Sequence, residues 1–209
     1  LYARRNDQAA GKVLERALQA ERPPPAALTL YGREEAERDP KGARAALERG
    51  AALYPGLPSF GELLVAMELR AGNTDAALAR ARETAARLPD LASAQIMLAR
   101  TLVASRKVDE AVQQAELVQQ RWPDQPGVAE LYLDVMMQAG RGDEAFQALN
   151  EQRAAGTLLP NARVLLARLY AARGEQLQAI ELLRAALADQ PNQPVAQNDL
   201  AFMLARRGE

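Results

Sequence analysis

Three charged residues of the sequence recur at a fixed interval: Arg100, Asp134 and Arg168 each lie 34 residues apart. A constant interval indicates a repeated structural unit, so we expect these side chains to lie side by side on successive units. Arginine binds carboxylates through charge-assisted hydrogen bonds, which would suit recognition of an extended peptide. Arginine and aspartate also pair with one another, at about 0.2 to 1 kcal/mol for an exposed pair. Mutual pairing is the favoured interpretation, and the two are compatible.

The sequence lacks the residues of the commonest catalytic and metal sites. It contains no cysteine and no histidine, which removes disulfides, thiolate and imidazole ligands, and the usual pairs of nucleophile and general base. The acidic cluster Glu34, Glu35 and Glu37 is typical of a solvated helix face rather than of acid–base chemistry. We therefore predict a protein that is not an enzyme and that uses no catalytic residue, metal or cofactor.

Charge and hydropathy exclude further classes of function. The net charge is −1 and the pI is about 5.8, which gives no basic face for nucleic acid. No run of about 18 apolar residues is present, so no membrane-spanning segment is predicted. The chain is 48% hydrophobic but only 4% aromatic, which predicts a core packed by alanine and leucine.

The best-defined unit of the repeat extends from Leu91 to Pro123. Apolar residues follow helical spacing on both sides of a break at Ser105-Arg106, and Pro123 stops the second segment. We expect two amphipathic helices that form an antiparallel hairpin.

Four series of residues recur at the 34-residue step, and each has a physical role. Glycine suits the turn between helices, at Gly72, Gly140, Gly174 and Gly208, with Arg38 and Arg106 in equivalent places. A small residue lets two helices approach closely, at Ala9, Ala43, Ala77, Ala111, Ala145 and Ala179. Proline ends the second helix, at Pro55, Pro89, Pro123 and Pro191, with Thr157 in the vacant place. Large apolar residues fill the space between hairpins, at Leu30, Leu64, Leu98, Tyr132, Leu166 and Leu200.

Along the chain we predict one array over residues 1–209. It comprises the second helix of a first repeat, about five full repeats, and the first helix of a further repeat. Asp39 is the expected N-cap of one second helix, with Pro40 in its first turn. The unit that ends with Gly156 and Pro160 lacks the usual proline, so we expect a longer or bent connection there. We interpret the chain as a fragment of a longer protein, and we hypothesise self-association through its uncapped last helix.

The stretch NARVLLARLYAARGEQLQAIELLRAALADQPNQ places seven residues in a recognisable pattern. They are Leu166, Ala167, Tyr170, Gly174, Ala179, Ala186 and Pro191. The pattern resembles the tetratricopeptide repeat (TPR) family, and the resemblance extends over nearly the whole chain. It implies an all-α fold, a right-handed superhelical solenoid of antiparallel helix hairpins. Those signature residues pack helices and identify no ligand.

In TPR-like superhelices the first helix of each hairpin lines a concave groove. Mapped onto this sequence, the resemblance implies a partner-binding groove formed by Glu62, Ala66, Ile96, Arg100, Glu130, Asp134, Val164, Arg168, Asn198 and Phe202. The family's carboxylate-binding variety needs a cluster of lysine, asparagine and arginine in the groove. The only lysines, Lys12, Lys41 and Lys107, do not map there, so capture of an acidic C-terminal tail is disfavoured.

Three classes of function are compatible with these observations. The leading one is a non-enzymatic scaffold that binds a protein or peptide in its groove. The second is a structural spacer or polysaccharide-handling module, against which the scarcity of aromatic residues argues mildly. An enzyme would need a catalytic domain outside this chain.

The Ala- and Arg-rich style of the chain, with its ending QNDLAFMLARRGE, is similar to bacterial TPR arrays of exosortase-associated lipoproteins and of cellulose-type exopolysaccharide secretion systems. This resemblance implies a periplasmic scaffold for export of a polymer or surface protein. A cytoplasmic adaptor is the alternative.

Overall fold

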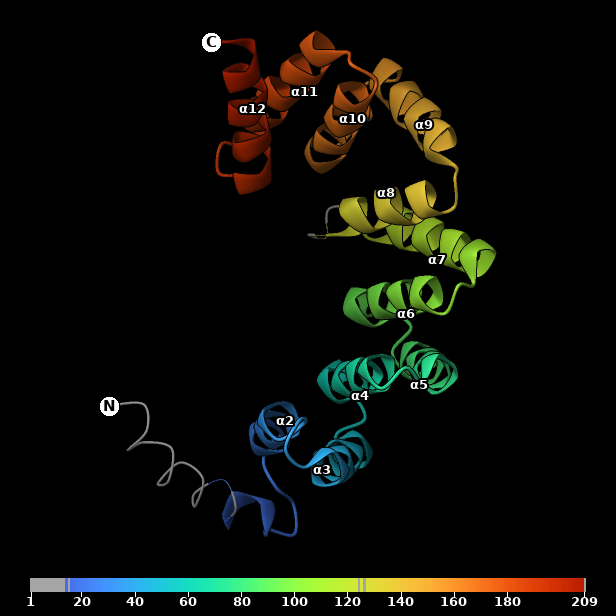
Figure 1. Cartoon of the computed structure of the whole chain (residues 1–209), viewed down its shortest axis with the longest axis vertical. Coiled ribbons are helices and arrows are strands. Elements are labelled where there is room, and N and C mark those ends of the chain that lie inside the picture. The colour runs from blue at the N-terminus through green and yellow to red at the C-terminus, as the bar shows by residue number, and fades with distance from the viewer. Residues whose placement is uncertain (1–13, 15, 124, 126, 209) are drawn as a thin grey trace, which may run out of the picture. The chain divides into compact units, whose positions relative to one another are not determined.

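The computed structural model describes residue 14, residues 16–123, residue 125 and residues 127–208 (Figure 1). These residues form α-helices joined by short connections, and no strand occurs among them. The chain divides into two compact units, residues 1–107 and 108–209, which we describe separately. The predicted roles of Ala9 and of the rest of residues 1–13 lie outside the described residues. The prediction of one continuous array stays a prediction.

The first unit contains helices that alternate between the two positions of a hairpin. They are α2 (Pro25–Glu34), α3 (Pro40–Leu53), α4 (Pro58–Arg70), α5 (Thr74–Arg87) and α6 (Ala92–Ala104). Consecutive helices pack against one another, and the first helices of neighbouring hairpins also make contact, α2 with α4 and α4 with α6. The first helices therefore share one face of this unit.

The second unit repeats the arrangement. Its helices are α7 (Val108–Arg121), α8 (Val128–Gln138), α9 (Gly142–Ala154), α10 (Pro160–Ala172), α11 (Gln176–Asp189) and α12 (Pro194–Arg207). The first helices α8 and α10 contact each other, and α10 and α11 (orange in Figure 1) pack side by side. The helices of the predicted hairpin Leu91 to Pro123 are present as α6 and α7, on either side of the division between the units.

The 34-residue step is exact in the second helices, which begin at Pro40, Thr74, Val108, Gly142 and Gln176. The fourth residue of each is the predicted alanine, and all five are fully buried: Ala43, Ala77, Ala111, Ala145 and Ala179. The four predicted prolines each follow the last residue of a second helix by two positions. The alanine and proline predictions are thus confirmed within the described residues.

The turns after α4, α6, α8 and α10 share one backbone geometry, whereas no described residue of the turn after α2 has positive φ, so Arg38 does not adopt the conformation of the equivalent glycines. Gly72, Gly140 and Gly174 have φ values of +77°, +70° and +81°. After Gly72, the Asn73 amide donates to the Glu68 carbonyl at 2.9 Å, which closes the helix end with a left-handed residue. Arg106 stands in the glycine position with φ of +57°, and the next amide, of Lys107, donates to the Leu102 carbonyl at 2.9 Å. An arginine therefore adopts the conformation that glycine adopts elsewhere.

The predicted cap of α3 is confirmed, and the connection 155–159 after α9 is one residue longer than the connections 54–57, 88–91 and 190–193, as predicted. The Asp39 side chain accepts a hydrogen bond from the Gly42 amide at 2.9 Å and caps α3, with Pro40 in the first turn. Where the proline is missing, α9 ends at Ala154, Gly156 has φ of +70°, and the Thr157 amide donates to the Gln152 carbonyl. A left-handed residue thus ends α9 in place of a proline.

The prediction that Leu30 packs between hairpins is wrong. Its side chain is 41% exposed, whereas Leu28 is 1% exposed and belongs to the core with Leu47, Phe60 and Leu64. Residues two positions apart lie about 200° apart around a helix, so Leu28 and Leu30 cannot face the same side. The equivalent residues Leu64 and Leu166 are fully buried, and Leu98, Tyr132 and Leu200 are half-buried.

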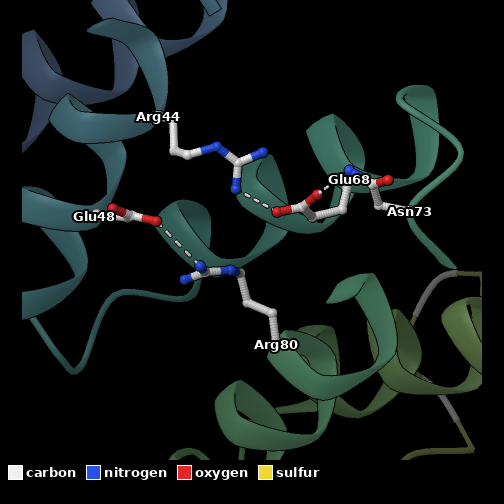
Figure 2. Close-up of polar contacts among 5 residues, drawn as sticks. All are labelled: Arg44, Glu48, Glu68, Asn73 and Arg80. Carbon is white, nitrogen blue, oxygen red and sulfur yellow. Dashed lines mark hydrogen bonds and ion pairs between the residues drawn. The ribbon is translucent and has the colours of Figure 1, made fainter. Parts of the chain in front are cut away.

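A buried carboxylate connects three elements of the first unit. Glu68 on α4 is 4% exposed, and it pairs with Arg44 of α3 and accepts a hydrogen bond from Asn73 at 3.0 Å (Figure 2). Beside it, Arg80 of α5 pairs with Glu48 of α3 at 3.2 Å. The hydrogen bond from Arg44 lowers the pKa of Glu68 below its ordinary value, against the opposing effect of burial. Glu68 therefore stays ionised and bonds both to the preceding hairpin and to its own turn.

We expect Glu68→Gln to lower the free energy of unfolding by about 1–3 kcal/mol at pH 7, because a charged acceptor is lost beside Arg44. The folded-state pKa of Glu68 is depressed, so its contribution is present above the ordinary pKa of 4.5 and is lost as pH falls through the lower, folded-state value. Urea denaturation from pH 7 to pH 3 should show that the difference in free energy of unfolding between parent and variant becomes smaller as the pH falls. Glu62→Gln, on the same helix, is the control. A difference in free energy of unfolding that does not change with pH would contradict the ionised state assigned to Glu68.

We expect Arg106→Gly to raise the free energy of unfolding by about 0.5–1 kcal/mol, since glycine adopts positive φ without a Cβ clash. The reciprocal Gly72→Arg should lower it by a similar amount. A Cβ at Gly72 would meet no atom within 4 Å, so this change reports backbone strain rather than a steric clash. Thermal denaturation measures the stability of both variants. The two changes in stability relative to the parent must have opposite signs.

Candidate functional site

The predicted groove residues of the first unit lie on the face shared by its first helices. Glu62 and Ala66 are on α4, and Ile96 and Arg100 are on α6, with each pair four residues apart and so on one side of its helix. Ala66 and Arg100 are exposed, whereas Glu62 and Ile96 are half-buried. Residues of this set are accessible to a partner, but none lines a cavity that the structure shows in this unit.

The predicted groove residues of the second unit lie on three first helices. They are Glu130 and Asp134 on α8, Val164 and Arg168 on α10, and Asn198 and Phe202 on α12. Asp134 and Asn198 are exposed and Phe202 is 60% exposed. Val164 is only 3% exposed, so most of its surface packs within the unit.

A cavity of about 360 Å³ lies on this side of the second unit, and we call it the amide cavity. Two predicted residues, Glu130 and Val164, line it. The other lining residues come from the start of α8, from α10, and from the connection between α11 and α12 with the start of α12: Gly127, Asn161, Gln190, Asn192, Gln193, Pro194 and Val195. Four of the nine lining residues carry side-chain amides, each of which both donates and accepts hydrogen bonds.

The Gln193 amide is the least satisfied polar group of the amide cavity. Its Nε2 donates to the Asn161 side-chain oxygen, which joins the α11–α12 connection to α10. Its Oε1 is buried and has no hydrogen-bond partner in the described part of the chain. An unsatisfied buried acceptor costs about 1–3 kcal/mol, so a ligand N–H that reached this oxygen would gain a strong bond.

The charge of the amide cavity is negative. Glu130 is the only charged residue among the described residues that line it. Neither Glu130 nor Asp134, one helical turn further along α8, forms an ion pair within the described part of this unit. The cavity therefore suits a ligand that presents N–H donors or a cation.

The expectation that Arg168 pairs with Asp134 is wrong. Arg168 Nε lies 2.6 Å from a carboxylate oxygen of Asp199 on α12. The Asp199 side chain is 18% exposed and that of Arg168 is 40% exposed, so the pair joins α10 to α12 at a partly exposed position. Helix α12 packs in the same unit and supplies this carboxylate, a choice that the repeat step alone could not reveal. Arg100 has no ion pair within the described part of the first unit.

The residues that the sequence prediction missed lie mainly in a connection. Gln190, Asn192 and Gln193 follow α11 and precede α12, whereas the resemblance to TPR superhelices predicts contacts on the first helices alone. The signal was present in the stretch Gln190-Pro-Asn-Gln193, which is rich in amides where the equivalent stretch Leu88-Pro-Asp-Leu91 carries leucine at both ends.

The described residues contain no cluster of three or more histidine, cysteine, aspartate or glutamate side chains arranged for a metal ion. Over the same residues, no helix has the length and apolar character needed to cross a bilayer.

We expect a double-mutant cycle of Arg168→Ala and Asp199→Ala to give a coupling energy of about 0.5–1 kcal/mol, since the pair is partly exposed and partly screened. The cycle of Arg168→Ala with Asp134→Ala should give coupling near zero. Urea denaturation of the single and double variants measures both. A larger coupling to Asp134 would overturn the assignment of the partner.

Comparisons with known proteins agree with this arrangement. Residues 160–203, which span α10, α11 and most of α12, match the tetratricopeptide repeat family model. No curated protein matches the chain.

Two solved structures are similar to most of the chain. TTC0263 of Thermus thermophilus, a thermophilic TPR protein, has a TM-score of 0.53 and 20% identity, over 87% of this chain and 100% of that one. PilF of Pseudomonas aeruginosa has a TM-score of 0.57 and 18% identity, over 96% of this chain and 92% of that one. The chain therefore has the helical-hairpin fold of tetratricopeptide repeat proteins, and its residues 160–203 carry the sequence pattern of that family.

Proposed function

We propose that the chain is a non-enzymatic scaffold that binds an extended protein segment, neutral or basic in charge, across the first helices of its second unit. The observation that carries this proposal is the amide cavity of about 360 Å³, which the predicted groove residues Glu130 and Val164 help to line. Its four amide side chains match the alternating donors and acceptors of a peptide main chain.

The charge of the bound segment follows from the side chains that are left without partners. Glu130 and Asp134 are acidic and lack ion pairs in the described part of the unit, whereas Arg168 is occupied by Asp199. A lysine or arginine of the ligand would therefore pair with Glu130, and an apolar side chain would contact Val195, which is 38% exposed. An acidic segment would be repelled.

The setting of this scaffold is a further part of the proposal. We propose that it acts in the bacterial envelope, in export of a polymer or surface protein, and that it is periplasmic. The support is the resemblance of the stretch QNDLAFMLARRGE to such arrays. Cell fractionation tests the compartment, and recovery with cytoplasmic proteins would favour a cytoplasmic adaptor. Self-association through α12, where Phe202 is 60% exposed, also stays a prediction, and sedimentation velocity measures it.

The ligand class is tested with a synthetic array of extended peptides sorted by net charge. We expect the parent chain to retain neutral and basic peptides in preference to acidic ones. The double variant Glu130→Arg, Gln193→Ala should lose this retention at least fivefold, since it reverses the cavity charge and removes an amide. Selection of acidic peptides by the parent would refute the proposal.

Glu151→Arg is the matched control for that experiment. Glu151 is an exposed glutamate on α9 in the same unit, and it does not line the amide cavity. It introduces the same change of charge, so unaltered retention by this variant assigns the effect to the cavity rather than to net charge. Equal loss in both variants would contradict the site. Retention of polysaccharide instead of peptide would favour the polymer-handling alternative.

A further inference from the structure

A second and larger cavity lies among the second helices of the second unit. It has a volume of about 460 Å³ and we call it the α9–α11 pocket. Its lining residues come from the end of α9, the following connection, α10 and α11: Arg153, Gly156, Leu158, Arg163, Glu181, Leu182, Ala185, Ala188 and Asp189. It shares no lining residue with the amide cavity, so the two present separate surfaces.

The first unit provides an internal comparison for this pocket. Three steps of 34 residues earlier, the equivalent place between α3, α4 and α5 encloses only about 30 Å³. Ala51 there corresponds to Arg153, and Gly61 corresponds to Arg163. The repeat geometry by itself therefore does not create the larger space.

Side-chain size on the last helix explains the difference. In the first unit α5 contributes Arg80, Glu83 and Arg87, where α11 has Leu182, Ala185 and Asp189. Arg80 reaches Glu48 of α3 at 3.2 Å and so crosses the space between the helices, whereas Arg87 pairs with Glu83 within α5 at 2.5 Å. The shorter side chains of α11 leave it open.

A second exchange of sizes occurs where the first and second helices meet. A Cβ on Gly61 would overlap the Thr84 side chain, so glycine is required in the first unit. The equivalent pair in the second unit is Arg163 on α10 and Ala186 on α11. The small residue of this pair is therefore on the second helix, whereas in the first unit it is on the first helix. Arg163 then crosses to α11, where it donates to the Ala185 carbonyl at 3.3 Å and pairs with Asp189.

The floor of the α9–α11 pocket is apolar, and four charged residues line the pocket: Arg163 pairs with Asp189, whereas Arg153 and Glu181 form no ion pair among the described residues. Leu158 and Leu182 are each 5% exposed. Arg153 donates to the Tyr170 hydroxyl at 3.4 Å and lies 5.8 Å from the ring centroid, and it has no carboxylate partner among the described residues. Glu181 is exposed and has no ion pair within the same part of the chain. Arg153 comes from α9 and Glu181 from α11, so the two charges stand on different helices.

We propose that the α9–α11 pocket is a second docking site, which binds a short protein segment carrying an aliphatic side chain between an acidic and a basic residue. The aliphatic side chain contacts Leu158 and Leu182, the acidic residue pairs with Arg153, and the basic residue pairs with Glu181. Opposite charges at the rim fix the direction of the segment, because reversal would place like charges together. This site is independent of the amide cavity and of its ligand.

The test uses the peptide acetyl-GGDALARGG-amide and the ¹⁵N-labelled full chain, followed by NMR titration. We expect saturable shifts at the amides of Gly156, Ala185 and Ala188, with none at Gly127 or Asn192 of the amide cavity. The charge-reversed peptide acetyl-GGRALADGG-amide should bind at least fivefold more weakly. Equal binding of the two peptides, shifts confined to the amide cavity, or no shift at millimolar peptide would each overturn the proposal.

Variants assign the binding to the pocket. Arg153→Ala installs the residue found at the equivalent Ala51 and should weaken binding at least fivefold, and Ala185→Leu should abolish it by filling the space. Both residues are exposed, so both variants should fold, and circular dichroism verifies this. Arg184→Ala removes an exposed cation of α11 that does not line the pocket and should leave binding unchanged. Unaltered binding by Arg153→Ala would refute the role of that cation.

Discussion

The close approach of helices at one buried alanine in each hairpin is the constraint on which the other features depend. Ala43, Ala77, Ala111, Ala145 and Ala179 are fully buried at the fourth position of successive second helices. A methyl side chain lets helix backbones come closer than a leucine would allow. With only 4% aromatic residues, the core is filled by small and aliphatic side chains in a fixed register. The 34-residue step follows from repetition of this contact.

Polar contacts add to this packing in different ways in the two units. In the first unit the buried Glu68 bonds to α3 and to its own turn, and Arg80 of α5 reaches back to Glu48 (Figure 2). In the second unit Arg168 pairs with Asp199 of α12, and Gln193 bonds to Asn161. A buried charge needs a partner because removal of one member leaves the other desolvated. This argument applies to Glu68, whereas the more exposed pairs Arg80–Glu48 and Arg168–Asp199 contribute less to stability.

The same register produces two different surfaces in the second unit. Amide side chains of α10 and of the α11–α12 connection line one cavity, beside Glu130. Short side chains on α11 open the α9–α11 pocket, where longer ones close its counterpart in the first unit. Equivalent helices surround the α9–α11 pocket and its counterpart in the first unit. The difference in volume between them therefore comes from side chains that do not pack the hairpins together. Recognition can therefore vary from repeat to repeat while the fold is kept.

The sequence by itself determined the helices, their turns and the buried alanines, because these depend on local spacing and backbone preference. The sequence likewise predicted that Arg106 takes a glycine position and that Asp39 caps a helix, since both depend on neighbouring residues. The tertiary structure alone decided that Leu28 rather than Leu30 is buried, that Arg168 pairs with Asp199, and which residues line the amide cavity and the α9–α11 pocket. Each of these depends on distances between side chains of different helices, and a periodic pattern specifies which residues are equivalent but not which of them meet.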